Sequence, residues 1–381
     1  MAPPSLHVDL DAAKETFASA PSALKLPTSF DDSNTLHIGI IGCGRIGQLH
    51  AANIAKKIPG CALICVSDVF ESAAIKVAQT YKVPMACKDA KDLIANPAVQ
   101  AVIVCSPTDT HADIIRQAAT AGKHVFCEKP VDKHLEVIDE LAVVIKEAGV
   151  KFFLGFQRRF DKHFLRAKEA RESGYLGKPL KLHLVARDPS PPPIGYLKQS
   201  GGIFSDMSSH DFDMARFLTG SDITEITAIG MADDPEIAAI GDYDHTILNL
   251  RFANGCIGVI DNSRSSPMGY DQRASFLGSE GSVQVDNVFP NTCDTSDKGG
   301  CHTDAPLNFF MERYADAYLQ EMIAFVDVCV NDKPAPCGVA DGRLTVIYAE
   351  AARKSLKEKR TVTIAEVDKA SASGTEAKAR Y

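Results

Sequence analysis

The sequence lacks three features that would each indicate a different class of protein. No apolar run approaches the roughly 18–20 residues that an α-helix needs to cross a bilayer. No block of basic residues occurs, and the net charge is −8 from 41 basic and 49 acidic side chains, which argues against wrapping a nucleic acid or docking on an anionic membrane. No C-x-x-C pair occurs among the 11 cysteines, several of which lie in apolar, strand-like runs. We therefore expect buried free thiols rather than disulfides, and a reducing, cytoplasmic compartment.

Neither end of the sequence has the features of a clear targeting signal. Residues 1–34 lack the apolar core of a secretory signal, and their acidic side chains are atypical of a transit peptide. Residues 366–381 are rich in Ala, Ser and Lys, which predicts a disordered tail. The final Ala-Arg-Tyr is only loosely similar to the peroxisomal Ser-Lys-Leu address, so a peroxisome-like organelle is the minor alternative to the cytoplasm.

Residues 35–156 alternate between two kinds of segment. Short apolar runs such as LHIGIIG at 36–42 and VQAVIVCS at 99–106 alternate with amphipathic segments such as THADIIRQAATAG at 110–122. Buried parallel strands have continuous apolar sequences of this kind, and helices connect them across both faces of the sheet. This half therefore predicts a doubly wound α/β domain, the first of two domains in a chain of 381 residues.

The first expected turn carries the pattern G-x-G-x-x-G, in Gly42, Gly44, Arg45, Ile46 and Gly47, with Cys43 as its second residue. Because the pattern follows a strand and opens a helix, it is more specific here than it would be alone. Glycines let the backbone approach a pyrophosphate, and the helix N-terminus offers unpaired N–H groups. We expect these residues to bind a dinucleotide, and a tight turn without a ligand is the alternative.

Asp68 ends the second expected strand, about twenty residues after the glycines, where the ribose of a dinucleotide should lie. A carboxylate accepts hydrogen bonds from the ribose diol and repels a 2′-phosphate. Val69, Phe70 and Glu71 follow, so no basic side chain is at hand for such a phosphate. The sequence therefore predicts NAD rather than NADP.

Residues 157–365 have a different pattern. Segments such as LKLHLVAR at 180–187 and HTILNLRF at 245–252 alternate apolar and polar residues, which is typical of a largely antiparallel sheet with one open face. The segment DPSPPP at 188–193 cannot be a central strand. We expect an α+β domain that contributes the substrate site, in the crevice at the carboxyl ends of the parallel strands.

The stretch SDMSSHDFD at 205–213 concentrates three acids and a histidine. In one continuous helix, Asp206, His210 and Asp213 would share a face and Asp211 would point elsewhere. A merely solvated face would not explain the flanking Gly-Gly and apolar run. A metal site would need further clustered His or Cys ligands, which this half lacks, so no metal is expected. We interpret the stretch as half of a catalytic site.

Lys129 is the candidate for the other half. It follows the apolar run HVFC within Glu128-Lys129-Pro130, at the end of an expected parallel strand. Proline restricts the residue before it and so fixes where the lysine points. A plain surface charge is the alternative.

Three motifs resemble those of a known family: Ser106-Pro107-Thr108-Asp109-Thr110-His111, Glu128-Lys129-Pro130 and Asp206-Met207-Ser208-Ser209-His210. Over residues 36–364 the sequence resembles the glucose–fructose oxidoreductase and inositol dehydrogenase family. Stretches such as GYDQR at 269–273 and ERYADAYLQE at 312–321 resemble its inositol 2-dehydrogenase branch. Ala186-Arg187-Asp188 stands where some inositol dehydrogenases have His-Arg-Asn, so the preferred isomer stays open.

The resemblance implies that the protein oxidises a cyclic polyol with NAD, converting myo-inositol to 2-keto-myo-inositol. It also implies a homo-oligomer, either a dimer or a tetramer, that forms through the open face of the sheet. It implies that Lys129, Asp206 and His210 meet over the nicotinamide, with His210 as the base. The residues that it assigns to cofactor binding are Ser106, Pro107, Thr108, His111, Glu128 and Lys129. The residues that it assigns to substrate binding are Arg158, Asp188, Tyr270 and Tyr314, together with the catalytic residues Lys129, Asp206 and His210. Alternatives are scyllo-inositol, another sugar as substrate, or a non-catalytic dinucleotide-binding regulator. Tyr270 and Tyr314 could instead be packing residues, and Arg159 could be structural.

Overall fold

The computed structural model describes residues 35–368. The expected extension at 1–34 and residues 369–381 of the expected tail lie outside the described residues. Backbone contacts divide the described chain into two units. The parallel-sheet unit holds the residues up to Phe160 together with Asp316–Ile347, and the open-sheet unit holds Asp161–Ala315 and Tyr348–Val367. The parallel-sheet unit therefore takes segments from both sides of the boundary expected at residues 156–157.

The parallel-sheet unit is built on six strands in the order β3-β2-β1-β4-β5-β6, all pairing in parallel within the described range. The strands are β1 Leu36–Ile41, β2 Cys61–Ser67, β3 Met85–Cys87, β4 Ala101–Val104, β5 His124–Glu128 and β6 Phe152–Gly155. The order reverses between β1 and β4, which is where a doubly wound sheet binds its ligand. The predicted fold of this half is confirmed.

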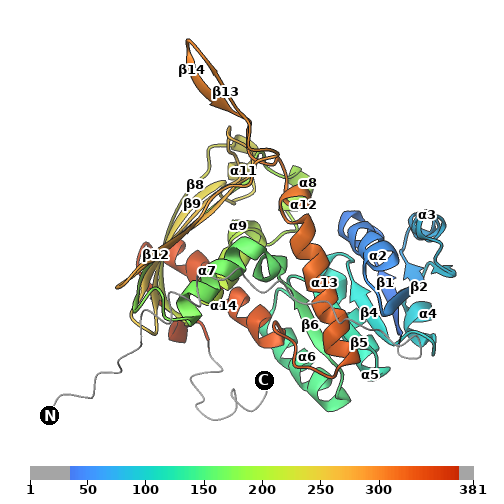
Figure 1. The fold of residues 1–381 in the computed structure, drawn as a ribbon. Coiled ribbons are helices and arrows are strands. Elements are labelled where there is room, and N and C mark those ends of the chain that lie inside the picture. The colour runs from blue at the N-terminus through green and yellow to red at the C-terminus, as the bar shows by residue number, and fades with distance from the viewer. Residues whose placement is uncertain (1–34, 369–381) are drawn as a thin grey trace. The chain divides into compact units, whose positions relative to one another are not determined.

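Helices connect these strands, as the amphipathic segments predicted (Figure 1). They are α2 Arg45–Lys57, α3 Glu71–Tyr81, α4 Ala90–Ala95, α5 His111–Thr120 and α6 Leu135–Ala148, with short 3₁₀ turns at Thr108–Thr110 and Gln157–Phe160. A later helix, α13 (Ala315–Val330), also packs here, because Phe325 contacts the rings of Phe126 at 5.6 Å and Phe153 at 6.0 Å. The start of α14 (Val339–Glu358) adds Val339 and Val346 to a second apolar cluster of this unit, which includes Val125, Cys127 and Leu154.

The main sheet of the open-sheet unit has seven described strands in the order β12-β11-β7-β10-β9-β8-β15. They are β7 Pro179–Arg187, β8 Ile223–Met231, β9 His245–Phe252, β10 Ile257–Ser263, β11 Asp271–Gly278, β12 Ser282–Val285 and β15 Val362–Thr363. Neighbouring strands run antiparallel except β7 and β10. The largely antiparallel sheet is confirmed, and the segment 188–193 lies outside the strands, as predicted.

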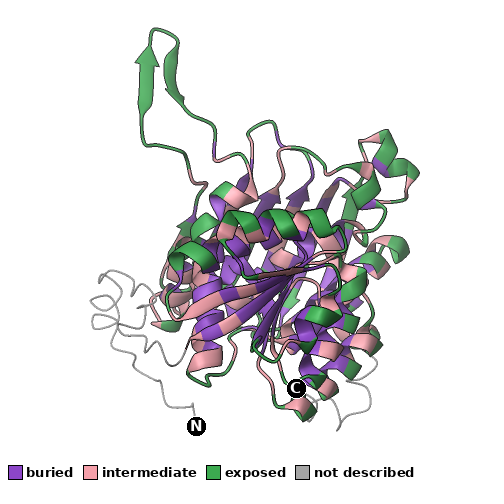
Figure 2. Ribbon diagram, turned by 90° about the vertical axis from the view of Figure 1, so that its right-hand side faces the viewer, coloured by how far each residue is buried: buried purple, intermediate pink, exposed green. Residues whose placement is uncertain are grey.

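Short helices accompany this sheet: α7 Lys162–Glu172, α8 Ile194–Leu197, α9 Gly202–Asp206, α10 Ser208–Thr219, α11 Pro235–Ala239 and α12 Phe310–Arg313. A 3₁₀ turn at Ile364–Glu366 follows β15. The sequence did not predict the hairpin of β13 (Asp294–Asp297) and β14 (Gly300–Thr303), whose residues are all exposed and which is drawn in green in Figure 2.

The two faces of the open sheet differ in burial. Along β9 the residues alternate, so Leu248 and Leu250 are buried while Ile247 on the other face is exposed. The second face also exposes Ile229 and Met231 of β8, at 61% and 56% of their full areas. Such a contiguous apolar surface is unusual for a face that stays in water.

Two further sequence-based expectations can be checked against the described residues. All 11 cysteines of the sequence lie in the described range and are free, as expected, but Cys293 and Cys301 are exposed and so are not the buried thiols that we expected. No helix in that range is long and apolar enough to cross a membrane.

Candidate functional site

The glycine turn between β1 and α2 has the geometry that a dinucleotide needs. A Cβ on Gly42 (φ +97°) would lie 2.6 Å from the backbone of Cys105, and one on Gly47 would lie 1.9 Å from the Gly42 carbonyl oxygen. A Cβ on Gly44, by contrast, would meet nothing within 4 Å. Gly42 and Gly47 thus bring the turn close to β4, while Gly44 opens onto space at the start of α2, where no side chain caps the helix. These features fit a pyrophosphate.

Asp68 follows β2 and braces this turn. Its Oδ2 accepts a hydrogen bond from the Cys43 N–H at 2.7 Å, and its Oδ1 accepts one from the Phe70 N–H at 2.8 Å. The carboxylate is thus held beside the glycine turn, and the next two side chains, Val69 and Phe70, are exposed and apolar. Its contact with a ribose stays a prediction.

The loop after β4 is tied to the loop after β5 by His111. The His111 ring is buried, with Nε2 at 2.8 Å from the Ser106 carbonyl oxygen and Nδ1 at 2.8 Å from that of Pro130. Within the first loop, the hydroxyls of Ser106 and Thr110 lie 2.6 Å apart. The structure therefore shows His111 organising two loops at the carboxyl edge of the sheet. Cofactor contacts of His111, Ser106, Pro107 and Thr108 stay predictions.

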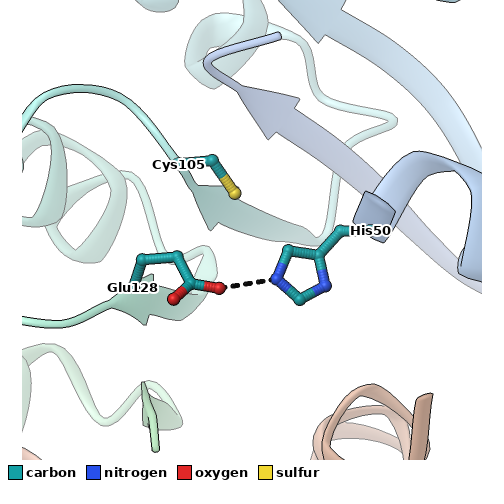
Figure 3. A group of neighbouring side chains, drawn as sticks. All are labelled: His50, Cys105 and Glu128. Carbon is teal, nitrogen blue, oxygen red and sulfur yellow. Dashed lines mark hydrogen bonds and ion pairs between the residues drawn. The ribbon is translucent and has the colours of Figure 1, made fainter. Parts of the chain in front are cut away.

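Lys129 lies where the sequence predicted, directly after β5, and its peptide bond to Pro130 is cis. The preceding Glu128 turns back into the unit, because its Oε1 lies 2.6 Å from Nε2 of the buried His50 on α2 (Figure 3). The strand end that presents Lys129 is thereby anchored to the helix that begins at the glycine turn.

A buried acidic cluster extends from this anchor and was not predicted from the sequence. Cys105 lies beside His50 and Glu128 (Figure 3), and Glu321 of α13 is fully buried. Neither carboxyl oxygen of Glu321 has a hydrogen-bond partner among the described residues. Burial, and then the nearby Glu128, raise the pKa of the Glu321 carboxyl well above its ordinary value.

Burial and Glu128 likewise raise the pKa of the Cys105 thiol well above its ordinary value. His50, Cys105 and Glu128 place one potential ligand atom each within 4.8 Å of the others.

The open-sheet unit holds Asp206 and His210 at a junction between two helices. We expected one continuous helix, and this expectation was wrong: α9 ends at Asp206 and α10 begins at Ser208. At the junction the His210 N–H donates to the Met207 carbonyl oxygen, three residues back instead of four. The angular offset of a regular helix therefore does not apply to this pair.

The other acids of the stretch have structural positions. Asp211 is buried, and its Oδ2 accepts a hydrogen bond from Nδ2 of Asn262 on β10 at 2.8 Å, so it points away toward the sheet, as expected. Asp213 is also buried. Asp206 and His210, by contrast, are only partly buried.

Two residues that the sequence did not single out bind the Asp206 carboxylate. The Arg264 guanidinium Nη1 donates to Oδ2 at 3.0 Å, and the Tyr196 hydroxyl donates to Oδ1 at 2.7 Å. Arg264 follows β10 and is fully buried. A lone arginine 58 residues from its partner gives no sequence signal.

The predicted substrate residues of the open-sheet unit differ in position. Asp188 follows β7, and its N–H donates to the Ser263 carbonyl oxygen at 2.8 Å. Tyr270 and Tyr314 are buried, with ring centroids 6.1 Å apart in an edge-to-face arrangement, which supports the packing role weighed for them. Their contacts with a substrate stay predictions.

In the parallel-sheet unit, Arg158 is buried within the turn after β6. Its neighbour Arg159 is structural, because it donates to the Pro336 carbonyl oxygen and to Asp341, both at 2.8 Å. Lys129 and Arg158 thus belong to one unit and Asp206 and His210 to the other. The meeting of Lys129 with Asp206 and His210 stays a prediction.

Comparisons with known proteins agree with the fold of both units. Residues 36–156 match the model of an oxidoreductase family with an NAD-binding Rossmann fold, and residues 164–284 match the GFO/IDH/MocA C-terminal domain. The chain is 44% identical to the myo-inositol 2-dehydrogenase of Thermotoga maritima, over 87% of this chain and 99% of the relative. It is 34% identical to a scyllo-inositol 2-dehydrogenase (NAD(+)) of Bacillus subtilis, over 84% and 93%.

A solved structure of a probable dehydrogenase from Thermotoga maritima superposes with a TM-score of 0.86 at 44% identity, covering 87% of this chain and 100% of that one. Both halves of the chain are thus matched, and the resemblance inferred from the three motifs is confirmed. This protein belongs to the GFO/IDH/MocA family of oxidoreductases.

Proposed function

We propose that this protein oxidises myo-inositol to 2-keto-myo-inositol with NAD as the hydride acceptor. The observation that carries the proposal is the 44% identity, over almost the whole relative, to a myo-inositol 2-dehydrogenase. The chain also has a lysine at the end of β5 and a carboxylate–histidine pair at the α9–α10 junction, the groups that alcohol oxidation requires.

In the proposed mechanism His210 is the general base. It takes the proton of the substrate hydroxyl, because imidazole titrates close to neutral pH. Lys129 donates a hydrogen bond to the same oxygen while negative charge develops on it. Asp206 stabilises the imidazolium that His210 becomes. NAD, which the glycine turn and Asp68 would hold, would supply the acceptor for the hydride that leaves the carbinol carbon.

The residues at the end of β2 support NAD over NADP. Asp68 is held next to the glycine turn, where a 2′-phosphate would meet a carboxylate. The side chains that follow, Val69 and Phe70, offer that phosphate no positive charge. Comparable kcat/KM for the two cofactors would contradict this assignment.

The choice of inositol isomer is tested by a substrate panel. The 34% identical relative is named for scyllo-inositol, and Ala186-Arg187-Asp188 departs from the His-Arg-Asn of some inositol dehydrogenases. The test is a panel of myo-, scyllo- and chiro-inositol and common aldoses, each with NAD and NADP, followed by absorbance of the reduced cofactor. Turnover of an aldose alone would replace inositol by another sugar, and cofactor binding without any turnover would overturn the enzymatic proposal.

We further propose that a second copy of the chain covers the open face of the seven-stranded sheet. Ile229, Met231, Ile247 and Met268 are exposed on or beside this face and line a hollow of about 460 Å³. Light scattering should give a dimer or tetramer, and a monomer alone would contradict the proposal. The free cysteines support a reducing, cytoplasmic location.

A further inference from the structure

We propose that Arg264 is the positioning residue for Asp206, and that Arg264 and Tyr196 together hold this carboxylate as a fixed anion at the α9–α10 junction. This inference rests on the proposed function, because Asp206 matters for catalysis only if the alcohol is oxidised beside it. It assigns roles to two residues that the sequence motifs do not contain.

The first observation is the burial of the Arg264 guanidinium. The residue is fully buried, and a buried cation is tolerated only when anions lie against it. Asp206 provides one, at 3.0 Å from Nη1, and Asp242 provides another, at 3.8 Å from Nη2. The backbone of Arg264 is also fixed, since its N–H donates to the Asp244 carbonyl oxygen at 2.7 Å.

The second observation is that α9 is held at both of its ends. Asp242 Oδ1 accepts a hydrogen bond from the Ile203 N–H at 3.0 Å, in the first turn of the helix. Asp206, in the last position of the helix, is bound by Arg264. The Arg264 guanidinium therefore faces both Asp242, which binds the first turn of α9, and Asp206, which is its last residue. This explains how a helix of only five residues can present a carboxylate in a defined direction.

The third observation concerns the other oxygen of Asp206. Tyr196 of α8 donates its hydroxyl to Oδ1 at 2.7 Å. Tyr196 is 52% exposed as a whole residue, but desolvation of its hydroxyl, and then the neighbouring Asp206 carboxylate, raise the pKa of Tyr196, so the phenol keeps its proton and remains a donor. Each carboxylate oxygen of Asp206 thus accepts a hydrogen bond, one from Arg264 and one from Tyr196. Asp206 therefore acts as a fixed negative charge and not as a proton carrier.

The experiment compares R264K, R264Q and Y196F with the wild-type enzyme. A hydrogen bond to a charged group is worth about 10- to 100-fold. We expect R264Q to lower kcat for inositol about 100-fold, R264K to recover part of this loss, and Y196F to lower kcat about 10-fold. The KM for NAD should be unchanged in all three. The acidic limb of the pH profile of kcat/KM should move to higher pH in R264Q, since removing a cation makes the site easier to protonate.

A control and a structural readout separate this inference from the proposed function. R273K changes a partly buried arginine of β11 that pairs with Asp271 and should leave kcat near the wild-type value. If folded R264Q and Y196F keep wild-type kcat and pH profile, the positioning role is wrong although the dehydrogenase stands. If the wild type oxidises no polyol, crystal structures of R264K and Y196F test the positioning of Asp206 directly. A displaced Asp206 side chain in these variants would support the inference, and an unchanged one would overturn it.

Discussion

The buried carboxyl of Glu321 leads to a measurable dependence of stability on pH. In the unfolded chain a glutamate has a pKa of about 4.3. In the folded unit, burial and Glu128 raise the pKa of Glu321 well above its ordinary value. Between these two pKa values the unfolded chain releases a proton that the folded chain keeps, so the free energy of unfolding falls as the pH rises. Glu321→Gln should remove this loss, because glutamine has nearly the shape of the protonated acid and does not titrate.

The magnitude follows from the linkage between proton binding and folding. A difference of one proton changes the free energy of unfolding by about 1.4 kcal/mol per pH unit. Over the measured range, from about pH 5.5 to about pH 7.5, the wild type should lose this amount relative to the variant for each pH unit in which only the folded chain keeps the proton. At about 2–4 °C per kcal/mol for a unit of this size, the gap in melting temperature should widen by roughly 3–6 °C for each such pH unit.

Differential scanning calorimetry across this pH range measures the gap directly. The matched control is Glu147→Gln, which changes an exposed glutamate on α6 of the same unit and should follow the wild type at every pH. A constant offset between Glu321→Gln and the wild type, independent of pH, would refute the reasoning. Such an offset would mean that the folded carboxyl titrates as it does in the unfolded chain.

Three further predictions concern activity and assembly. His210→Ala should lower kcat at least about 100-fold while NAD binding, measured by calorimetry, is intact, and a loss below tenfold would remove His210 as the base. Asp68→Ala should weaken NAD more than NADP, so the ratio of their kcat/KM values should fall, and an unchanged ratio would mean that Asp68 serves only the glycine turn. Replacing Ile229 and Met231 by glutamates should shift the oligomer toward monomer in light scattering without lowering the melting temperature of the isolated chain, and an unchanged mass would place the interface elsewhere.

The features that could be predicted from the sequence are those with a local pattern. The strand–turn–helix at Gly42–Gly47 and the strand end at Lys129 follow from a few adjacent residues, and both lie where they were expected. The split between a parallel and a largely antiparallel sheet follows from continuous against alternating apolar residues, as at 99–106 and 245–252.

The features that could not be predicted depend on contacts between distant segments. The residues around Met207 did not indicate the helix junction, nor the contacts of the preceding helix, whose Asp206 and Ile203 are bonded by Arg264 and Asp242 from distant parts of the sequence. His50 and Glu321 gave no signal for the same reason. They become notable only when α2 and α13 bring them near Glu128.

The position of α13 bears on how this polypeptide is made. Phe126 and Phe153 of the parallel sheet are covered by Phe325, and a separate apolar cluster of the same unit includes Cys337 and Val339. During translation, the apolar packing of the parallel-sheet unit cannot be completed until nearly two hundred residues beyond Phe160 have been synthesised. A gene truncated after Phe160 would therefore express a fragment with exposed aromatic side chains, prone to aggregation and in need of chaperones, even though it contains every strand of its sheet.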